Sequence, residues 1–215
     1  MRAAVFAGGP SVDTGRAGQI ASSCDVIYAA DSGADTAIAS GLIPDKLFGD
    51  MDSVSPETLL FLKEKGVDTE VFPVEKDMTD SEICVRALPE DSEIILIGSF
   101  AGRPDHMMSN IMMAVKLHSE GRDITLTDGV SDFIPLFGQD EIRISGIQEP
   151  EGLKISIIPF SEVKGVTTEG LYYELKDASL NPGSSFSVSN KIKDGSDSFF
   201  IGIEEGKAGV VITPL

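Results

Sequence analysis

Short apolar runs alternate with helical segments over the first 132 residues, and this rhythm limits the possible fold more than any other feature. The apolar runs predict strands at 3–7, 25–30, 46–48, 70–74, 93–97 and 123–127, and the segments between them predict helices at 13–22, 33–40, 56–65, 80–88 and 105–119. Strands that alternate with helices are typical of βαβ units. We therefore expect residues 1–132 to form an α/β domain with a doubly wound, mostly parallel sheet.

The helical pattern ends near residue 133, and a different pattern follows. Short alternating segments predict strands at 141–145, 154–159, 170–175, 185–189, 198–204 and 209–213. Turn sequences such as Asn181-Pro182-Gly183 separate them. Short strands with frequent turns indicate an antiparallel sandwich. We expect residues 133–215 to form a second, small all-β domain.

The charge balance narrows the range of partners. The 215 residues include 35 acidic and 17 basic side chains, and the formal net charge is -18. Nucleic acids and anionic membranes are bound by clustered Lys and Arg, so we expect neither as a partner. The longest apolar runs, such as 94–97 and 111–115, are far shorter than the roughly 18 residues of a membrane span. The short apolar N-terminus and the two cysteines favour a cytoplasmic location.

Aspartates follow several of the predicted strands. Asp31 comes after the second strand, and Asp50 and Asp52 come after the third, next to Gly49. Ligands of open α/β sheets bind at the carboxyl ends of the strands, where these side chains gather. Two carboxylates 4 Å apart repel each other by roughly 1 kcal/mol even in water, and a divalent cation such as Mg²⁺ relieves that repulsion. A turn whose aspartates bind local amides would give the same pattern.

Two further segments at this edge contain helix starts and charged groups. In "EKDMTDSE", Thr79 and Glu82 fit a capping box, and Asp80 begins the helix, where anions and metal ions can also bind. In "GSFAGRPDHMMSN", Arg103 is a candidate phosphate ligand, although a salt bridge to Asp105 is equally compatible with the sequence. This segment has no Lys-Ser/Thr pair of a P-loop, so it does not predict a Walker-type NTPase.

Six motifs in this order resemble the thiamine pyrophosphokinase family: "ADSGAD", "FGDMDSV", "EKDMTDSE", "GRPDHMMSN", "GLYYEL" and "SVSN". The resemblance runs from about residue 29 to the end of the chain. It implies transfer of a diphosphate from ATP to the hydroxyl of thiamine, with Mg²⁺ as cofactor and AMP as second product. It also implies a homodimer, in which thiamine binds between the α/β domain of one subunit and the sandwich of its mate.

The resemblance assigns roles to particular residues. The aspartates expected to organise the metal and the polyphosphate are Asp31, Asp50, Asp52 and Asp80. The expected nucleotide and phosphate residues are Asp77, Thr79, Arg103 and Asp105, and Asp50, Asp52, Asp80 and Arg103 are the expected catalytic set. Tyr173, Ser189 and Asn190 are the thiamine candidates. The chain departs from the family pattern at Met51, where Phe is common, at Ala101, where a second Gly is common, and in having no Trp.

Two other functions are compatible with parts of the sequence. Asp50, Asp52 and Val54 satisfy the Asp-x-Asp-x-Val pattern of haloacid-dehalogenase-like phosphatases, in which the first aspartate becomes phosphorylated. That motif would normally follow the first strand of its domain, whereas here it follows the third. The other possibility is a non-enzymatic protein whose sandwich binds a small molecule.

Overall fold

The computed structural model describes residues 1–9 and 13–214, and the chain divides into two compact units. Unit 1 contains residues 1–113 and 122–130, and unit 2 contains residues 114–121 and 131–215, of which the last lies outside the described part. The α/β domain and the all-β domain that the sequence predicts correspond in type to these units. The boundary between 132 and 133 stays a prediction.

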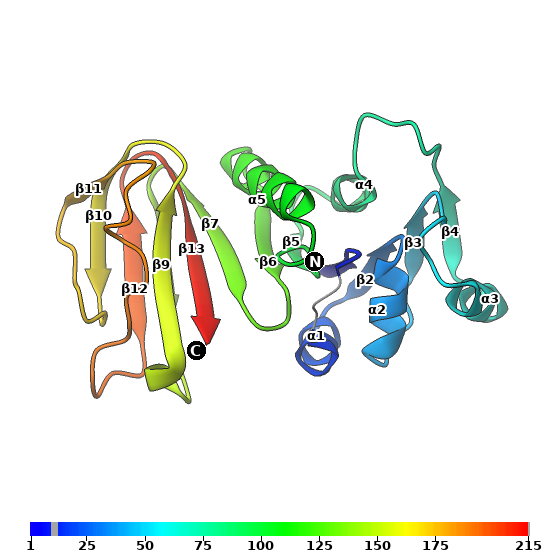
Figure 1. The fold of residues 1–215 in the computed structure, drawn as a ribbon, viewed down its shortest axis with the longest axis horizontal. Helices are drawn as coiled ribbons and strands as arrows, with labels where there is room; N and C mark the ends of the chain where they lie inside the picture. Colours follow the sequence, from blue (N-terminus) through cyan, green and yellow to red (C-terminus); the bar gives the residue numbers. More distant parts are fainter. Residues whose placement is uncertain (10–12, 215) are drawn as a thin grey trace. The chain divides into compact units, whose positions relative to one another are not determined.

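Unit 1 contains six parallel strands, which lie side by side in the order β4-β3-β2-β1-β5-β6 (Figure 1). They are β1 (Arg2–Phe6), β2 (Val26–Ala30), β3 (Lys46–Gly49), β4 (Asp68–Val71), β5 (Glu93–Ile97) and β6 (Asp123–Thr127). The order runs outward from β1 in both directions, so the sheet is doubly wound and its switch point lies between β1 and β5. This agrees with the fold class expected from the sequence.

Five helices flank this sheet: α1 (Thr14–Ala21), α2 (Gly33–Ala39), α3 (Pro56–Lys65), α4 (Asp80–Ala87) and α5 (Pro104–Ser119). Figure 1 shows α1, α2 and α3 on one face of the sheet and α4 and α5 on the other. This is the arrangement that right-handed crossovers produce. Buried side chains of the sheet and helices, including Phe6, Ala34, Leu47, Leu62 and Ile97, form the core on the face of α1–α3.

Apart from the end of α5, unit 2 consists mainly of two groups of antiparallel strands. One group pairs β7 (Asp132–Phe137), β13 (Lys207–Pro214) and β9 (Leu153–Pro159), and the other has the order β11 (Ala178–Leu180), β10 (Val163–Glu169), β12 (Phe199–Ile203) and β8 (Asp140–Ile144). A short 3-10 helix, η1, covers Pro150–Gly152. Both groups contribute to one buried core, for example through Ile155, Val166, Ile201 and Val210. The predicted sandwich is therefore correct as an architecture.

Two of the predicted strands in unit 2 are wrong. Residues 170–175 and 185–189 form turns and bends rather than strands. In the first of these segments, the Tyr173 backbone N–H donates a hydrogen bond to the Asn190 side chain at 3.1 Å, and Asn190 donates one to the Tyr173 carbonyl at 2.8 Å. One side chain thus takes the place of a strand partner. The sequence reading also missed β7, β10 and β11.

The structure gives two findings on membranes and cysteines. Among residues 1–9 and 13–214, no helix combines the length and the apolar character that crossing a membrane requires. Cys24 and Cys84 are both free, and Cys84 is fully buried.

Candidate active site

A cavity of about 750 Å³ lies at the carboxyl ends of the parallel strands of unit 1. Its wall receives residues from the segments that follow β1, β2, β3, β4 and β5, among them Gly8, Asp31, Asp50, Asp80 and Arg103. The convergence follows from the topology, because parallel strands bring all of these segments to one edge of the sheet. We call this cavity the cleft.

Asp31 and Gly49 meet at the floor of the cleft. Asp31 follows β2 with a left-handed backbone (φ 45°), and its N–H donates to the Phe48 carbonyl at 2.9 Å. Its Oδ1 accepts a hydrogen bond from Met51 N–H at 3.2 Å. Gly49 has φ 144°, and a Cβ there would collide with the Asp31 carboxylate. Glycine is therefore required at this position for Asp31 to reach the turn after β3.

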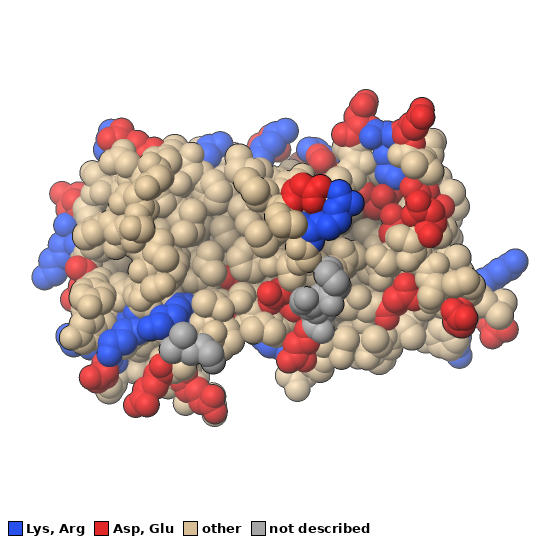
Figure 2. Space-filling model, viewed as in Figure 1, with Lys and Arg blue, Asp and Glu red and all other residues tan. Residues whose placement is uncertain are grey.

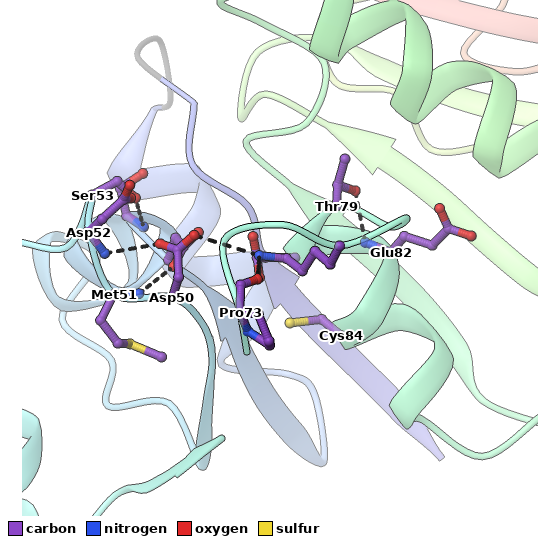
Figure 3. Close-up of polar contacts among 12 residues, drawn as sticks. Asp50, Met51, Asp52, Ser53, Pro73, Thr79, Glu82 and Cys84 are labelled. Atoms are coloured by element: carbon purple, nitrogen blue, oxygen red, sulfur yellow. Dashed lines mark hydrogen bonds and ion pairs between the residues drawn. The ribbon is translucent and has the colours of Figure 1, made fainter. Parts of the chain in front are cut away.

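Asp50 and Asp52 form a tight turn after β3 (Figure 3). Asp50 Oδ1 accepts a hydrogen bond from the Asp52 N–H at 3.1 Å, and Met51 between them has φ 68°. The turn of hydrogen-bonded aspartates that the sequence left open is thus present. Oxygen atoms of Asp31, Asp50 and Asp52 also lie within 4.8 Å of one another, which is a grouping that could hold a metal ion. The turn is therefore confirmed, and the metal role of the aspartate pair stays a prediction that this grouping permits.

Lys76 places a positive charge among these acids. Its ammonium lies 3.1 Å from Asp80 Oδ1 and 3.7 Å from Asp50 Oδ2, and it donates to the Pro73 carbonyl at 3.2 Å. The side chains of Lys76, Asp50 and Asp80 are only 15%, 12% and 16% exposed. The sequence analysis assigned no role to Lys76. Its neighbourhood depends on how the loop after β4 turns back, which strand and helix patterns do not reveal.

The crowded acids shift each other's pKa. Burial, together with the charge of Asp80, raises the pKa of Asp31 to about 7. The hydrogen bond and the charge of Asp50 raise the pKa of Asp52. The pKa of Asp50 is lowered, chiefly by the hydrogen bond from the Asp52 backbone and further by Lys76. For Lys76, the contact with Asp80 and the charges of Asp80 and Asp50 outweigh burial and raise the pKa. A cation shared by these carboxylates would offset their mutual repulsion and lower the raised pKa values.

Helix α4 begins at the cleft with the predicted cap. The Thr79 side chain accepts from the Glu82 N–H at 3.3 Å, and Asp80 is the first helical residue (Figure 3). The interpretation of Thr79 as a helix cap is therefore correct. Thr79 and Asp80 also line the cleft.

Arg103 lines the cleft and forms the salt bridge that the sequence left open. Its guanidinium contacts Asp105 through two bonds, Nη2 to Oδ2 at 2.6 Å and Nε to Oδ1 at 3.2 Å. Both side chains are largely exposed, and the hydrogen bond from Arg103 lowers the pKa of Asp105 to about 2. A phosphate oxygen could take the place of the carboxylate at this fork. The phosphate role of Arg103 stays a prediction.

Three of the predicted residues do not line the cleft. Asp52 belongs to the carboxylate group but is exposed, and Asp105 contacts the cleft only through Arg103. Asp77 is exposed and lies outside the lining, and its role stays a prediction. The structure adds His106 and the buried Asn110, whose amide donates to the Ser99 carbonyl at 3.1 Å. No spacing in the sequence marked these two residues.

Unit 2 contains a second cavity, of about 430 Å³, lined largely by apolar side chains. Tyr173 and Asn190 line it, and Asn190 holds the Tyr173 backbone as described above. Ser189 does not line the cavity; it sits beside it with φ 61°, and its N–H donates to Ser156 Oγ. Phe186 also lines the cavity and is 71% exposed. The sequence analysis did not single out Phe186, because it expected that segment to be a strand.

Charge on the surface is mostly acidic. In the face shown in Figure 2, red acidic side chains outnumber blue basic ones, in line with 35 acidic and 17 basic residues in the chain. Among the described residues that line the cleft, the formal cations are Lys76 and Arg103, and both contact carboxylates.

The fold and the cleft define a two-domain protein, in which a doubly wound α/β domain with a carboxylate-rich cleft is joined to an all-β domain. Two family descriptions match the chain: "Thiamin pyrophosphokinase, catalytic domain" at residues 17–126 and "Thiamin pyrophosphokinase, vitamin B1 binding domain" at residues 140–206. The chain belongs to the thiamine pyrophosphokinase family.

Individual relatives agree with this assignment. The chain is 32% identical over 178 residues to thiamine pyrophosphokinase of Bacillus subtilis (strain 168), a match that covers 80% of this chain and 82% of the relative. It is also 32% identical to thiamine pyrophosphokinase 1 of Oryza sativa subsp. japonica, over 70% of this chain and 60% of the relative. The fold resembles a crystal structure of thiamine pyrophosphokinase from Bacillus subtilis, with a TM-score of 0.84, 23% identity, and coverage of 100% of this chain and 99% of that chain.

Proposed function

We propose that this protein transfers a diphosphate group from ATP to the hydroxyl of thiamine, giving thiamine diphosphate and AMP. The observation that carries the proposal is that both halves of the chain match the same family, one as its catalytic domain and the other as its vitamin B1 binding domain. Each half also contains a cavity suited to its part: a carboxylate-rich cleft in unit 1 and a largely apolar cavity in unit 2.

Mg²⁺ is the cofactor we propose, and the residues of the cleft fit it. The grouped ligand atoms of Asp31, Asp50 and Asp52 are all carboxylate oxygens, the donor type that Mg²⁺ prefers. Asp80 lies close enough to Asp31 to raise its pKa, so it belongs to the same electrostatic group. When bound, the ion would neutralise charge on the polyphosphate and fix its orientation.

The protein's own groups would position the donor. Arg103 would exchange its contact with Asp105 for a phosphate, using the same two N–H groups. The start of α4 would offer backbone N–H groups to an anion, with Thr79 holding the helix end in place. Catalysis of phosphoryl transfer consists mainly of such positioning and charge neutralisation. Asp77 stays a proposed nucleotide contact on resemblance alone.

Thiamine would bind in the cavity of unit 2. The exposed rings of Tyr173 and Phe186 give flat apolar surfaces in a chain that has no Trp, and either can stack on an aromatic ligand. Asn190 would act mainly by holding Tyr173, since its side chain already bonds the Tyr173 backbone on both sides. Ser189 stays a candidate through its position beside this loop.

We also propose a homodimer in the cytoplasm. Tyr173 and Phe186 are 67% and 71% exposed at the cavity of unit 2, and a second subunit that covered them would enclose the ligand. The free state of both cysteines supports a reducing compartment. Sedimentation equilibrium tests the dimer, because a monomer at micromolar concentration would contradict it.

Phosphorus NMR on the protein with ATP, Mg²⁺ and thiamine tests the activity directly. We expect AMP and thiamine diphosphate to form together, and Asp50→Asn to abolish both under the same conditions. Formation of ADP or free phosphate instead would contradict the proposal. Neither alternative function is favoured by the comparisons. A phosphorylated Asp50 would support the phosphatase, and thiamine binding without turnover would support the non-enzymatic binder.

A further inference from the structure

Lys76 is held in the cleft by two carboxylates and one backbone carbonyl. Its ammonium contacts Asp80, Asp50 and the Pro73 carbonyl, and only 15% of the side chain is exposed. Of these three contacts, the one to the Pro73 carbonyl is a hydrogen bond, and the other two pair the positive charge of Lys76 with the carboxylates of Asp80 and Asp50.

The contact with Asp80 is also imperfect. The ammonium lies 3.1 Å from Asp80 Oδ1, yet this oxygen is buried and receives no hydrogen bond of acceptable direction. An ammonium is a point charge on a flexible stem, and it can neutralise a carboxylate without matching its geometry. This oxygen of Asp80 is therefore compensated in charge but not in hydrogen bonding, and a better-placed cation would gain at this position.

Lys76 contacts the same acids that surround the grouped ligand oxygens. Asp50 belongs to the group that could hold a metal ion, and Asp80 adjoins Asp31 of that group. We propose that Lys76 is an internal counter-cation of the cleft, which competes with a divalent cation for Asp50 and Asp80. The cleft then binds the metal ion together with the polyphosphate, because the negative charges of the polyphosphate offset the positive charge of Lys76. Without the polyphosphate, the cleft binds the metal ion only weakly.

The test measures binding of Mn²⁺ by electron paramagnetic resonance, first without any nucleotide. We expect Lys76→Met to bind Mn²⁺ about tenfold or more tightly than the wild type, since one like charge a few ångströms away opposes a divalent ion by at least that factor. Lys76→Arg keeps the charge and should stay within about threefold of the wild type. Lys63→Met, at an exposed position of α3, makes the same change in net charge and should have no such effect.

A second titration adds a non-hydrolysable ATP analogue. In the wild type the analogue should raise the affinity for Mn²⁺ strongly, and in Lys76→Met this factor should shrink, because the lysine no longer opposes the metal. Equal binding of free Mn²⁺ by the wild type and Lys76→Met would overturn the proposal. So would a loss of metal-free nucleotide binding in Lys76→Met with unchanged Mn²⁺ binding, which would make Lys76 a phosphate ligand.

Two further measurements keep the result interpretable. Circular dichroism checks that each variant is folded, and Lys76→Gln, which retains a donor, replaces Lys76→Met if that variant does not fold. The inference rests on the proposed function only for the identity of the ion and the nucleotide. Because the first titration uses neither thiamine nor turnover, a failure of diphosphate transfer with tighter Mn²⁺ binding would count against the function alone.

Discussion

The carboxyl of Asp31 gives a prediction in which a substitution stabilises the protein and removes its activity. Burial and the charge of Asp80 raise its pKa from 3.8 to about 7. At pH 8 this group is ionised in the folded protein, and the full pKa shift of Asp31 would lower the free energy of unfolding by about 4 kcal/mol. Asp31 is only half-buried, and solvent screening reduces this to about 2 kcal/mol.

The sign of the effect follows from proton binding. Between about pH 4 and 7 the folded state holds the Asp31 proton and the unfolded state has lost it, so the free energy of unfolding falls as pH rises through this window. Asparagine resembles the protonated acid and can still accept the hydrogen bond from Met51. Without metal, Asp31→Asn should therefore be more stable than the wild type by about 2 kcal/mol at pH 8, and equally stable near pH 4.

Urea denaturation in the presence of a chelator at pH 4, 6 and 8 measures this difference. Asp91→Asn, an exposed aspartate in the loop before β5, is the matched control and should show no such pH dependence. The same Asp31→Asn protein should lose diphosphate transfer by at least about a hundredfold, because a preorganised charged group at the reacting phosphates is missing. A variant that is less stable at pH 8, or a difference that does not change with pH, would refute the reasoning.

The remaining predictions concern other parts of the two units. Asp50→Asn should reduce transfer by at least about a hundredfold while the circular dichroism spectrum stays unchanged, whereas near-normal turnover would argue against a metal role. Burial raises the pKa of the Cys84 thiol well above its usual range and raises that of Cys24 less, so a thiol reagent at pH 8 should label Cys24 first. Asn190→Ala should raise the KM for thiamine several-fold and leave that for ATP unchanged, because it frees the Tyr173 backbone. Removing divalent cations should weaken ATP binding more than raising the salt concentration does, as calorimetric titration can measure.

The sequence predicted the α/β unit well because its local signals agree with its tertiary structure. Helix α3 has the predicted limits since Ser55 caps its start, Pro56 is its first residue, and Gly66 ends it with φ 72°. Strands β5 and β6 also have the predicted limits. The meeting of the aspartates could be expected because parallel strands end at a common edge. These features depend on short stretches of sequence and on a general rule of topology.

The errors in unit 2 have a different physical origin. Strand β10 was missed because Gly165, with φ 66°, interrupts its alternation at a shift in register between Val163 and Val166. The two false strands have apolar alternation, but the Asn190 side chain holds the first, and hydrogen bonds of Ser187 and Ser189 to β9 hold the second. Contacts between residues distant in sequence decided these cases. The position of Lys76 among the acids depends on such contacts as well. No local pattern encodes them.

The acidic composition gives a physical reason for the metal ion that we propose for the cleft. Among the described residues lining it, the formal positive charges belong to Lys76 and Arg103, and each already contacts a carboxylate. A polyphosphate that entered alone would have to break these contacts while facing Asp31, Asp50 and Asp80, each of which repels a phosphate charge by roughly 1 kcal/mol at 4 Å even in water. A metal ion that arrives with the nucleotide brings its own positive charge and lets the carboxylates become ligands. Under this proposal, the negative charge that would exclude a free nucleotide becomes the means by which the metal complex is selected.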